Sequence, residues 1–133
     1  PITTHTEDGQ LGDAQQALLT SFGLPAHRII VGHCCGSSDH AYHMKIVAGG
    51  SYLGFDRFGI EAMQPDDVRV TSLLKLLGAG AGARVVVSHD TVWCWRGAPL
   101  PASPLWEPSH FTRRIIPKLK HFLITSMWGA MRT

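Results

Sequence analysis

Three short apolar runs in this chain each end on a side chain that can bind a ligand. Residues 1–4 are followed by His5, residues 29–32 by His33, and residues 84–89 by Asp90. Continuous runs rich in β-branched residues are typical of strands buried on both faces, as in a parallel sheet covered by helices. Because the carboxyl ends of parallel strands share one edge of the sheet, we expect these three side chains to converge.

Between these runs, apolar residues recur at intervals of three and four, which predicts amphipathic helices. The expected helices are 11–22, about 37–48, 65–77 and 109–123, with a further strand at 51–56. The apolar residues expected to face the core are Leu11, Ala14, Ala17, Leu18 and Phe22 in the first helix, and Val68, Leu73, Leu74 and Leu77 in the third. Pro117 predicts a kink in the last helix.

Strand and helix therefore alternate four times, which is the rhythm of a parallel sheet or of a (β/α)8 barrel. A small flavodoxin-like binding domain also fits four such units, but it needs a phosphate-binding loop after the first strand. Glu7-Asp8-Gly9 is a poor loop of that kind. Residues 91–108 are too long for a simple turn, and their tryptophans indicate a functional rather than a disordered segment.

Composition narrows the class of protein. The 133 residues suit one modest domain, with 44% apolar and 17% charged residues. A net charge of +2, with scattered basic residues, gives no reason to expect nucleic acid as a partner. No apolar run reaches 18 residues, so no membrane partner is expected. The adjacent Cys34 and Cys35 are a poor disulfide pair and favour a reducing, cytoplasmic location.

Two imidazoles and a carboxylate are ligands that suit zinc and similar divalent ions. The alternative for His33 alone is a hydrogen-bonded core histidine. The strand at 51–56 would add Asp56 and Arg57 to the same edge. We expect His40 and His43 to lie on an exposed helix face, and His27, His110 and His121 to lie on the surface or at caps. His89 should point to the other side of its strand, into the barrel wall or toward the helices. Gly32 and Gly54 are expected to allow close approach of the backbone.

Four motifs resemble the phosphotriesterase family of the amidohydrolase superfamily. They are Thr3-Thr4-His5-Thr6, Ile30-Val31-Gly32-His33, the stretch Tyr52-Leu53-Gly54-Phe55-Asp56-Arg57-Phe58-Gly59, and Val87-Ser88-His89-Asp90. They occur in the family's order between residue 1 and about residue 120. The Asp-Arg-Phe-Gly stretch is closer to the phosphotriesterase-like lactonases than to the dedicated organophosphate hydrolases.

The resemblance implies a (β/α)8 barrel with a two-metal centre, in which the metals are zinc or a similar divalent ion. His5 and His33 would bind the more exposed metal, and Asp90 would bind the more buried metal and accept a proton during catalysis. Arg57, Trp93 and Trp95 would contact a small-molecule ester, lactone or phosphotriester. Metal ions supply such hydrolases with an activated water and a polarised substrate oxygen.

The chain also departs from the family pattern. It has no counterpart of the strand-one His-x-His pair or of the bridging lysine of strand four, Gly36 replaces a relay aspartate, and residues 121–133 form a divergent tail. We therefore expect residues 1–133 to form the C-terminal half of the barrel, which alone would be inactive. The alternative function is that of a truncated half-barrel that only binds or pairs. Its two unpaired sheet edges predict association with a second copy.

Overall fold

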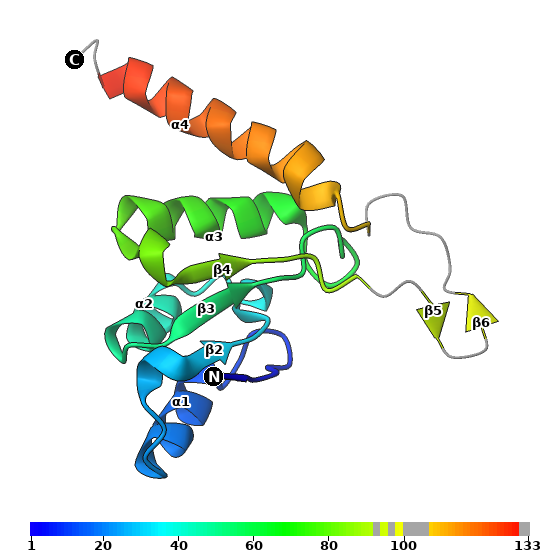
Figure 1. The fold of residues 1–133 in the computed structure, drawn as a ribbon. Coiled ribbons are helices and arrows are strands. Elements are labelled where there is room, and N and C mark those ends of the chain that lie inside the picture. Colours follow the sequence, from blue (N-terminus) through cyan, green and yellow to red (C-terminus); the bar gives the residue numbers. More distant parts are fainter. Residues whose placement is uncertain (92–93, 96–97, 100–106, 131–133) are drawn as a thin grey trace.

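The computed structural model describes residues 1–91, 94–95, 98–99 and 107–130, with side chains except at 94–95, 98–99 and 126–130. The elements in chain order are β1 (Ile2–Thr3), α1 (Gly12–Ser21), β2 (Ile29–Val31), α2 (His40–Ala48), β3 (Tyr52–Phe55), α3 (Asp66–Gly78), β4 (Val85–Val87), β5 (Cys94–Trp95), β6 (Ala98–Pro99) and α4 (Ile116–Ala130). Figure 1 shows their arrangement.

The four main strands form one parallel sheet in the order β1-β2-β3-β4. Ile2 pairs with Ile29, Ile30 with Tyr52, and Gly54 with Val86, so the register runs continuously across the sheet. Each crossover between neighbouring strands passes through a helix. This confirms the expected α/β architecture, which is that of half a (β/α)8 barrel. The strands β5 and β6 pair with each other, antiparallel, outside this sheet.

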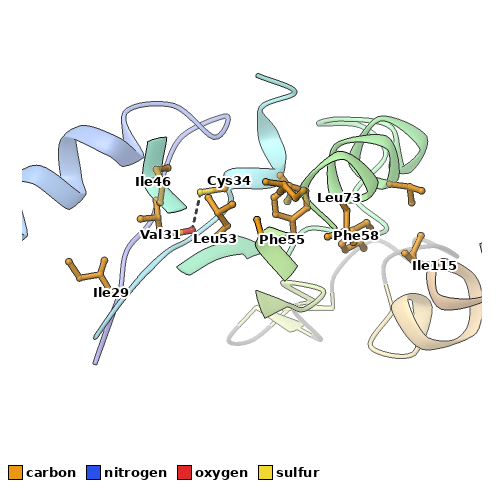
Figure 2. Close-up of a cluster of buried hydrophobic side chains, with 13 residues drawn as sticks. Ile29, Val31, Cys34, Ile46, Leu53, Phe55, Phe58, Leu73 and Ile115 are labelled. Carbon is orange, nitrogen blue, oxygen red and sulfur yellow. Dashed lines mark hydrogen bonds between the residues drawn. The ribbon is translucent and has the colours of Figure 1, made fainter. Parts of the chain in front are cut away.

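The core lies between the sheet and the helices. Ile29, Val31, Leu53 and Phe55 are fully buried on the helix-facing side of the sheet, where they meet residues such as Ile46 and Leu73 (Figure 2). Ile30 and Val86, on the opposite face, line an open pocket instead. The expectation that these strands are buried on both faces is therefore wrong. Only one face is covered, because the described strands do not close around the other.

The apolar side expected for α1 does not face the core. Leu18 is 59% exposed and Phe22 is 83% exposed, whereas Gly12 and Gln16 are the buried residues of the helix. A Cβ at Gly12 would lie 2.4 Å from the Tyr42 hydroxyl oxygen, so the glycine allows α1 to approach α2 closely. The Gln16 side chain then donates a hydrogen bond of 2.9 Å to the Ile46 carbonyl. This close packing turns the apolar stripe of α1 outward.

In α3 the apolar side is rotated from the expected one. Leu73 is buried as expected, but Val70 and Leu76 accompany it, while Val68 and Leu77 are more than one-third exposed. Arg69 is also fully buried in this helix, because it has partners described below. The spacing of apolar residues alone does not indicate that a charged residue, Arg69, lies on the buried side of the helix.

The last helix begins with a wide π-helical turn, Phe111–Ile115, that runs into α4. Pro117 is the second residue of α4, and the irregular π-helical turn lies before it. The proline therefore stands near the start of the helix, where it is tolerated, and not at a kink in the middle. The helix continues to Ala130, and it diverges from α3 toward its C-terminal end (Figure 1). Within the described residues, no helix combines the length and apolar character that crossing a membrane requires.

Candidate functional site

A pocket of about 400 Å³ opens at the carboxyl ends of the parallel strands. Its lining includes His5 after β1, His33 after β2, Asp56 after β3 and Asp90 after β4. The structure thus brings the three predicted ligand residues to the rim of one pocket. Threonine and aliphatic side chains from the strands form the remaining wall, namely Thr3, Thr4, Ile30, Val86 and Val87, with Ser88 beside them.

Two of the rim residues have an unusual backbone conformation. The φ angle is 61° at His33 and 48° at Asp90, both in the left-handed region that residues other than glycine seldom adopt. At each residue the left-handed backbone changes the direction of the chain where the strand ends, and with it the direction of the side chain. Such conformations cost of order 1–3 kcal/mol each and often mark functional positions, so they support a role for this rim.

Two glycines let the strands approach one another just below the rim. A Cβ at Gly32 would lie 2.2 Å from the carbonyl oxygen of Thr4, the residue that follows β1. A Cβ at Gly54 would lie 2.7 Å from a carboxylate oxygen of Asp56 and 3.0 Å from the Cα of Gly32. The expectation of close backbone approach at both glycines is confirmed. The Thr6 hydroxyl also donates to the Gly32 carbonyl at 2.8 Å, which joins the segments that follow β1 and β2.

The two histidines at the rim face each other through one ring nitrogen apiece. His33 Nε2 lies 3.0 Å from His5 Nδ1, and the two rings meet edge to face with centroids 4.5 Å apart. Two imidazole nitrogens that share a tetrahedral zinc ion lie about 3.3 Å apart, given Zn–N bonds of ~2.0–2.1 Å. The spacing of these two nitrogens therefore fits a pair of ligands to one divalent ion.

The outer nitrogens of both rings have carboxylate neighbours. His33 Nδ1 lies 2.9 Å from Asp56 Oδ1, and His5 Nε2 lies 3.4 Å from Glu7 Oε2. Because a carboxylate accepts, Asp56 selects the tautomer of His33 that carries its proton on Nδ1 and leaves a lone pair on Nε2. Carboxylates in this position typically orient histidines that bind metals. Asp56, which the sequence places at this edge but not among the ligands, is thus a candidate for positioning His33.

Asp90 lies in an ion pair with Arg57. Arg57 Nε donates to Asp90 Oδ2 at 3.1 Å, and the arginine side chain is only 9% exposed. Arg57 is not among the described residues that line the pocket, although the resemblance implies contact with substrate. Its role in the structure is to hold the carboxylate of Asp90.

The described residues do not form a complete metal site. Among them, no group of three or more His, Cys, Asp or Glu side chains lies close enough to bind one ion. The residues present fit the implied metal as a half-site, in which His5 and His33 are the donors and Asp90 lies across the pocket. Trp93 falls outside the described residues. Trp95 pairs with Ala98 through its backbone in β5, and its side chain also falls outside them.

A second polar cluster lies between α3, the loop after β3 and the start of the last helix. Asp66, 5% exposed, accepts from Arg69 Nη1 at 3.0 Å, from His110 Nε2 at 2.6 Å and from the Gly59 backbone N–H at 3.0 Å. The prediction of a surface or cap position for His110 is wrong, because this histidine is 2% exposed. The cluster fixes the loop that follows Arg57 against two helices.

Burial also changes the titration of groups below the site. Desolvation raises the pKa of the Cys34 thiol to about 12 and raises the pKa of Cys35, so neither thiol is suited to act as a nucleophile. Both cysteines are buried and free, as expected of a poor disulfide pair. The prediction of an exposed position for His43 is wrong, because this histidine is fully buried. Its Nε2–H donates a hydrogen bond of 2.9 Å to the Cys34 carbonyl oxygen. Desolvation lowers the pKa of His43.

Comparison with curated proteins finds relatives of greater length. A phosphotriesterase homology protein of Mycobacterium tuberculosis is 35% identical over 130 residues, which cover 94% of this chain and 40% of the relative. An aryldialkylphosphatase of Saccharolobus solfataricus is 34% identical over 91 residues, which cover 68% of this chain and 29% of that protein. The chain thus spans about 40% of the length of the relative from Mycobacterium.

Solved structures of similar proteins also include phosphotriesterase-like enzymes. A mutant of a phosphotriesterase-like lactonase from Deinococcus radiodurans is 41% identical, with a TM-score of 0.83 over 91% of this chain and 41% of that chain. An organophosphorus hydrolase from Deinococcus radiodurans is 38% identical, with a TM-score of 0.85 over 91% of this chain and 39% of that chain. The profile of the phosphotriesterase family matches residues 1–127. The chain belongs to the phosphotriesterase family.

Proposed function

We propose that this chain supplies the His5–His33 part of the metal centre of a hydrolase that acts on lactones or phosphotriesters. The observation that carries the proposal is the 3.0 Å approach of the two ring nitrogens at the carboxyl end of the sheet, with Asp56 orienting one of them. The names of its relatives, a lactonase, an organophosphorus hydrolase and an aryldialkylphosphatase, support the substrate class.

Each residue at the rim would have a separate task in that reaction. His5 Nδ1 and His33 Nε2 would hold a divalent metal ion, of which zinc is our choice because imidazole and carboxylate donors suit it. A bound ion of this kind lowers the pKa of a water and polarises the oxygen of the substrate. Asp90 would accept a proton from the attacking water, while Arg57 keeps its carboxylate in place through Oδ2.

The alternative is that the chain binds or pairs without turnover. The absence of a three-ligand group among the described residues favours this reading for the chain by itself, because zinc sites usually need three or four protein ligands. We therefore expect the 133-residue chain alone to show negligible hydrolysis. We also place it in the cytoplasm, because Cys34 and Cys35 are unpaired.

The function is best tested in a chimaera. The chain would replace the matching segment of the Deinococcus radiodurans lactonase, which supplies the rest of the fold. We expect the purified chimaera to hydrolyse a γ-lactone or an aryl phosphotriester, and its His33→Asn variant to lose activity at least 100-fold. His27→Asn, a change at an exposed position, should have no effect. A chimaera that melts cooperatively and holds metal, yet hydrolyses neither substrate, would contradict the proposal.

A further inference from the structure

We propose that His110, which is not among the residues that line the rim pocket, is a positioning residue for the carboxylate of Asp90. His110 holds Asp66 by a hydrogen bond, and Asp66 holds the turn that follows β3. That turn carries Arg57, the partner of Asp90 in the ion pair. The inference rests on the proposed function only in taking Asp90 as the group that accepts a proton. It deepens that function by naming a residue that controls the position of this group from a distance.

The first contact joins His110 to Asp66. His110 Nε2 lies 2.6 Å from Asp66 Oδ2, and the two residues are only 2% and 5% exposed. Because the carboxylate accepts, the imidazole donates through Nε2. Arg69 Nη1 donates to the other oxygen at 3.0 Å, so two side-chain donors are directed at one buried carboxylate. A buried oxygen that loses its donor is destabilised, so without His110 the carboxylate shifts toward another donor or water enters.

The second contact joins this carboxylate to the turn that follows β3. The Gly59 backbone N–H donates to Oδ1 of Asp66 at 3.0 Å and lies 3.2 Å from Oδ2. Arg69 Nη2 donates to the Ile60 carbonyl at 3.0 Å, so two side chains of α3 hold the turn. A hydrogen bond of 3.2 Å from the Ile60 N–H to the Arg57 carbonyl closes it. A shift of Asp66 therefore displaces the backbone of Arg57.

An apolar contact couples the same turn to the residue after His110. The side chain of Phe58 is fully buried, and its ring centroid lies 5.0 Å from that of Phe111. Phe58 also belongs to the buried cluster that includes Ile115, from the same π-helical turn as Phe111 (Figure 2). The start of the last helix thus meets the turn at a polar contact and at an apolar one. The position of the turn therefore depends on how this helix is seated.

The third contact joins Arg57 to Asp90 at the rim. Arg57 Nε donates to Asp90 Oδ2 at 3.1 Å. Arg57 Nη1 is buried and has no hydrogen-bond partner among the described residues. The guanidinium is therefore positioned chiefly by the backbone that carries it, which is the turn held by Asp66. The Asp90 side chain is 39% exposed, so a displacement of Arg57 would let its carboxylate rotate toward solvent.

The competing explanation is that His110 contributes only to overall stability. The two explanations differ in where the loss of its hydrogen bond is felt. If His110 positions Asp90, the contact between Arg57 and Asp90 loosens more than contacts elsewhere in the chain. If it only stabilises the fold, all contacts loosen together. Arg84 provides the comparison, since its Nη1 donates to the Gly50 carbonyl at 3.1 Å, at the opposite end of the sheet.

The first experiment measures exchange of arginine Nε–H protons with water, by nuclear magnetic resonance of the ¹⁵N-labelled chain. An Arg57→Lys variant assigns the Arg57 signal by its loss. In His110→Phe, which keeps a ring but removes the donor, we expect exchange at Arg57 to accelerate about 10-fold while exchange at Arg84 is unchanged. His110→Gln, whose amide nitrogen can donate in place of Nε2, should restore the native rate. Gln16→Ala removes the bond to the Ile46 carbonyl in another part of the fold, and this control for lost stability should leave exchange at Arg57 unchanged.

Equal acceleration at Arg57 and Arg84, or no acceleration at Arg57, would overturn the proposal. If His110→Phe does not melt cooperatively in the 133-residue chain, the same exchange is measured in the chimaera, where the rest of the fold supports the variant.

The second experiment measures hydrolysis by the chimaera. We expect His110→Phe to lower kcat about 10- to 100-fold and to leave KM within about twofold, because the displaced Asp90 transfers a proton and does not bind the substrate. His110→Gln should recover most of the lost kcat. An unchanged kcat in an active His110→Phe chimaera would overturn the proposal. A chimaera that is inactive with His110 in place would refute the proposed function instead, and exchange at Arg57 would still decide whether His110 positions the rim.

Discussion

His33 and Asp56 make two contacts with each other across neighbouring strands. The imidazole Nδ1 lies 2.9 Å from Asp56 Oδ1, and the His33 backbone N–H donates to the same carboxylate at 3.1 Å. The side chains are only 12% and 17% exposed. One carboxylate therefore fixes both the strained backbone of His33 and the direction of its ring, which makes Asp56 the main support of the proposed metal ligand.

Asp56→Asn tests this support. The amide keeps the size of the side chain but cannot match the charge-assisted bonds to His33, so we expect the free energy of unfolding to fall by about 1–3 kcal/mol. Zinc affinity should fall about 10- to 100-fold, as for other residues that orient metal-binding histidines. Urea denaturation and competition with a zinc chelator measure the two effects. The exposed Asp8→Asn change is the control, and equal behaviour of the two variants would contradict this role.

Gly32→Ala should destabilise the sheet strongly. The added Cβ would lie 2.2 Å from the Thr4 carbonyl oxygen, and because both atoms belong to paired backbones, the strands must separate. We expect a loss of about 3 kcal/mol in the free energy of unfolding. Gly78→Ala, at the end of α3 with no atom within 4 Å, should instead stabilise the chain by about 0.4–1 kcal/mol. Thermal denaturation of both variants checks the contrast, and a Gly32→Ala chain as stable as the native one would refute it.

Arg69→Met should be costly because it removes the guanidinium that faces the buried carboxylate of Asp66. Breaking a buried ion pair by removing one partner typically costs about 3–5 kcal/mol. Lys75→Met removes an exposed cation from the same helix and should change stability by no more than about 0.5 kcal/mol. Urea denaturation gives both values. If both changes lower the free energy of unfolding by a similar small amount, the Asp66–Arg69–His110 cluster contributes little to stability.

Acid should weaken the fold partly through His43. Desolvation lowers its pKa in the folded chain, so the unfolded chain takes up a proton near the ordinary value of 6.5 while the folded chain does not. The contribution of neutral His43 to the free energy of unfolding is therefore complete above pH 6.5. It is lost as the pH falls from 6.5 through the lowered pKa of the folded chain. His43→Phe should show a smaller loss of stability between pH 7 and pH 5 than the native chain. His27→Gln, at an exposed site, should keep the native pH dependence.

The sequence predicts the sheet and its functional edge because both depend on local patterns. Short β-branched runs define the strands, and the polar residue that ends each run lies at the rim, as for His5 and Asp90. The motif containing Asp56 was visible as well, but its contact with His33 depends on the turn of the His33 backbone. A sequence pattern does not specify that angle.

The errors concern packing between elements distant in sequence. The partner of His110 is Asp66, 44 residues away, so nothing near His110 indicated its burial. The apolar spacing correctly indicates a helix at α1, but the close contact at Gly12 leaves Leu18 and Phe22 exposed.

The central claim is that His5 and His33 form a pair of ligands for one divalent ion, and nuclear magnetic resonance of the imidazole nitrogens tests it most directly. Zinc would be titrated into the ¹⁵N-labelled chain while the ring nitrogens of its histidines are observed. We predict selective shifts at His5 Nδ1 and His33 Nε2, with the exposed His27 and His121 unchanged. Unchanged resonances of His5 and His33 at saturating zinc, or equal shifts at all four histidines, would contradict the account.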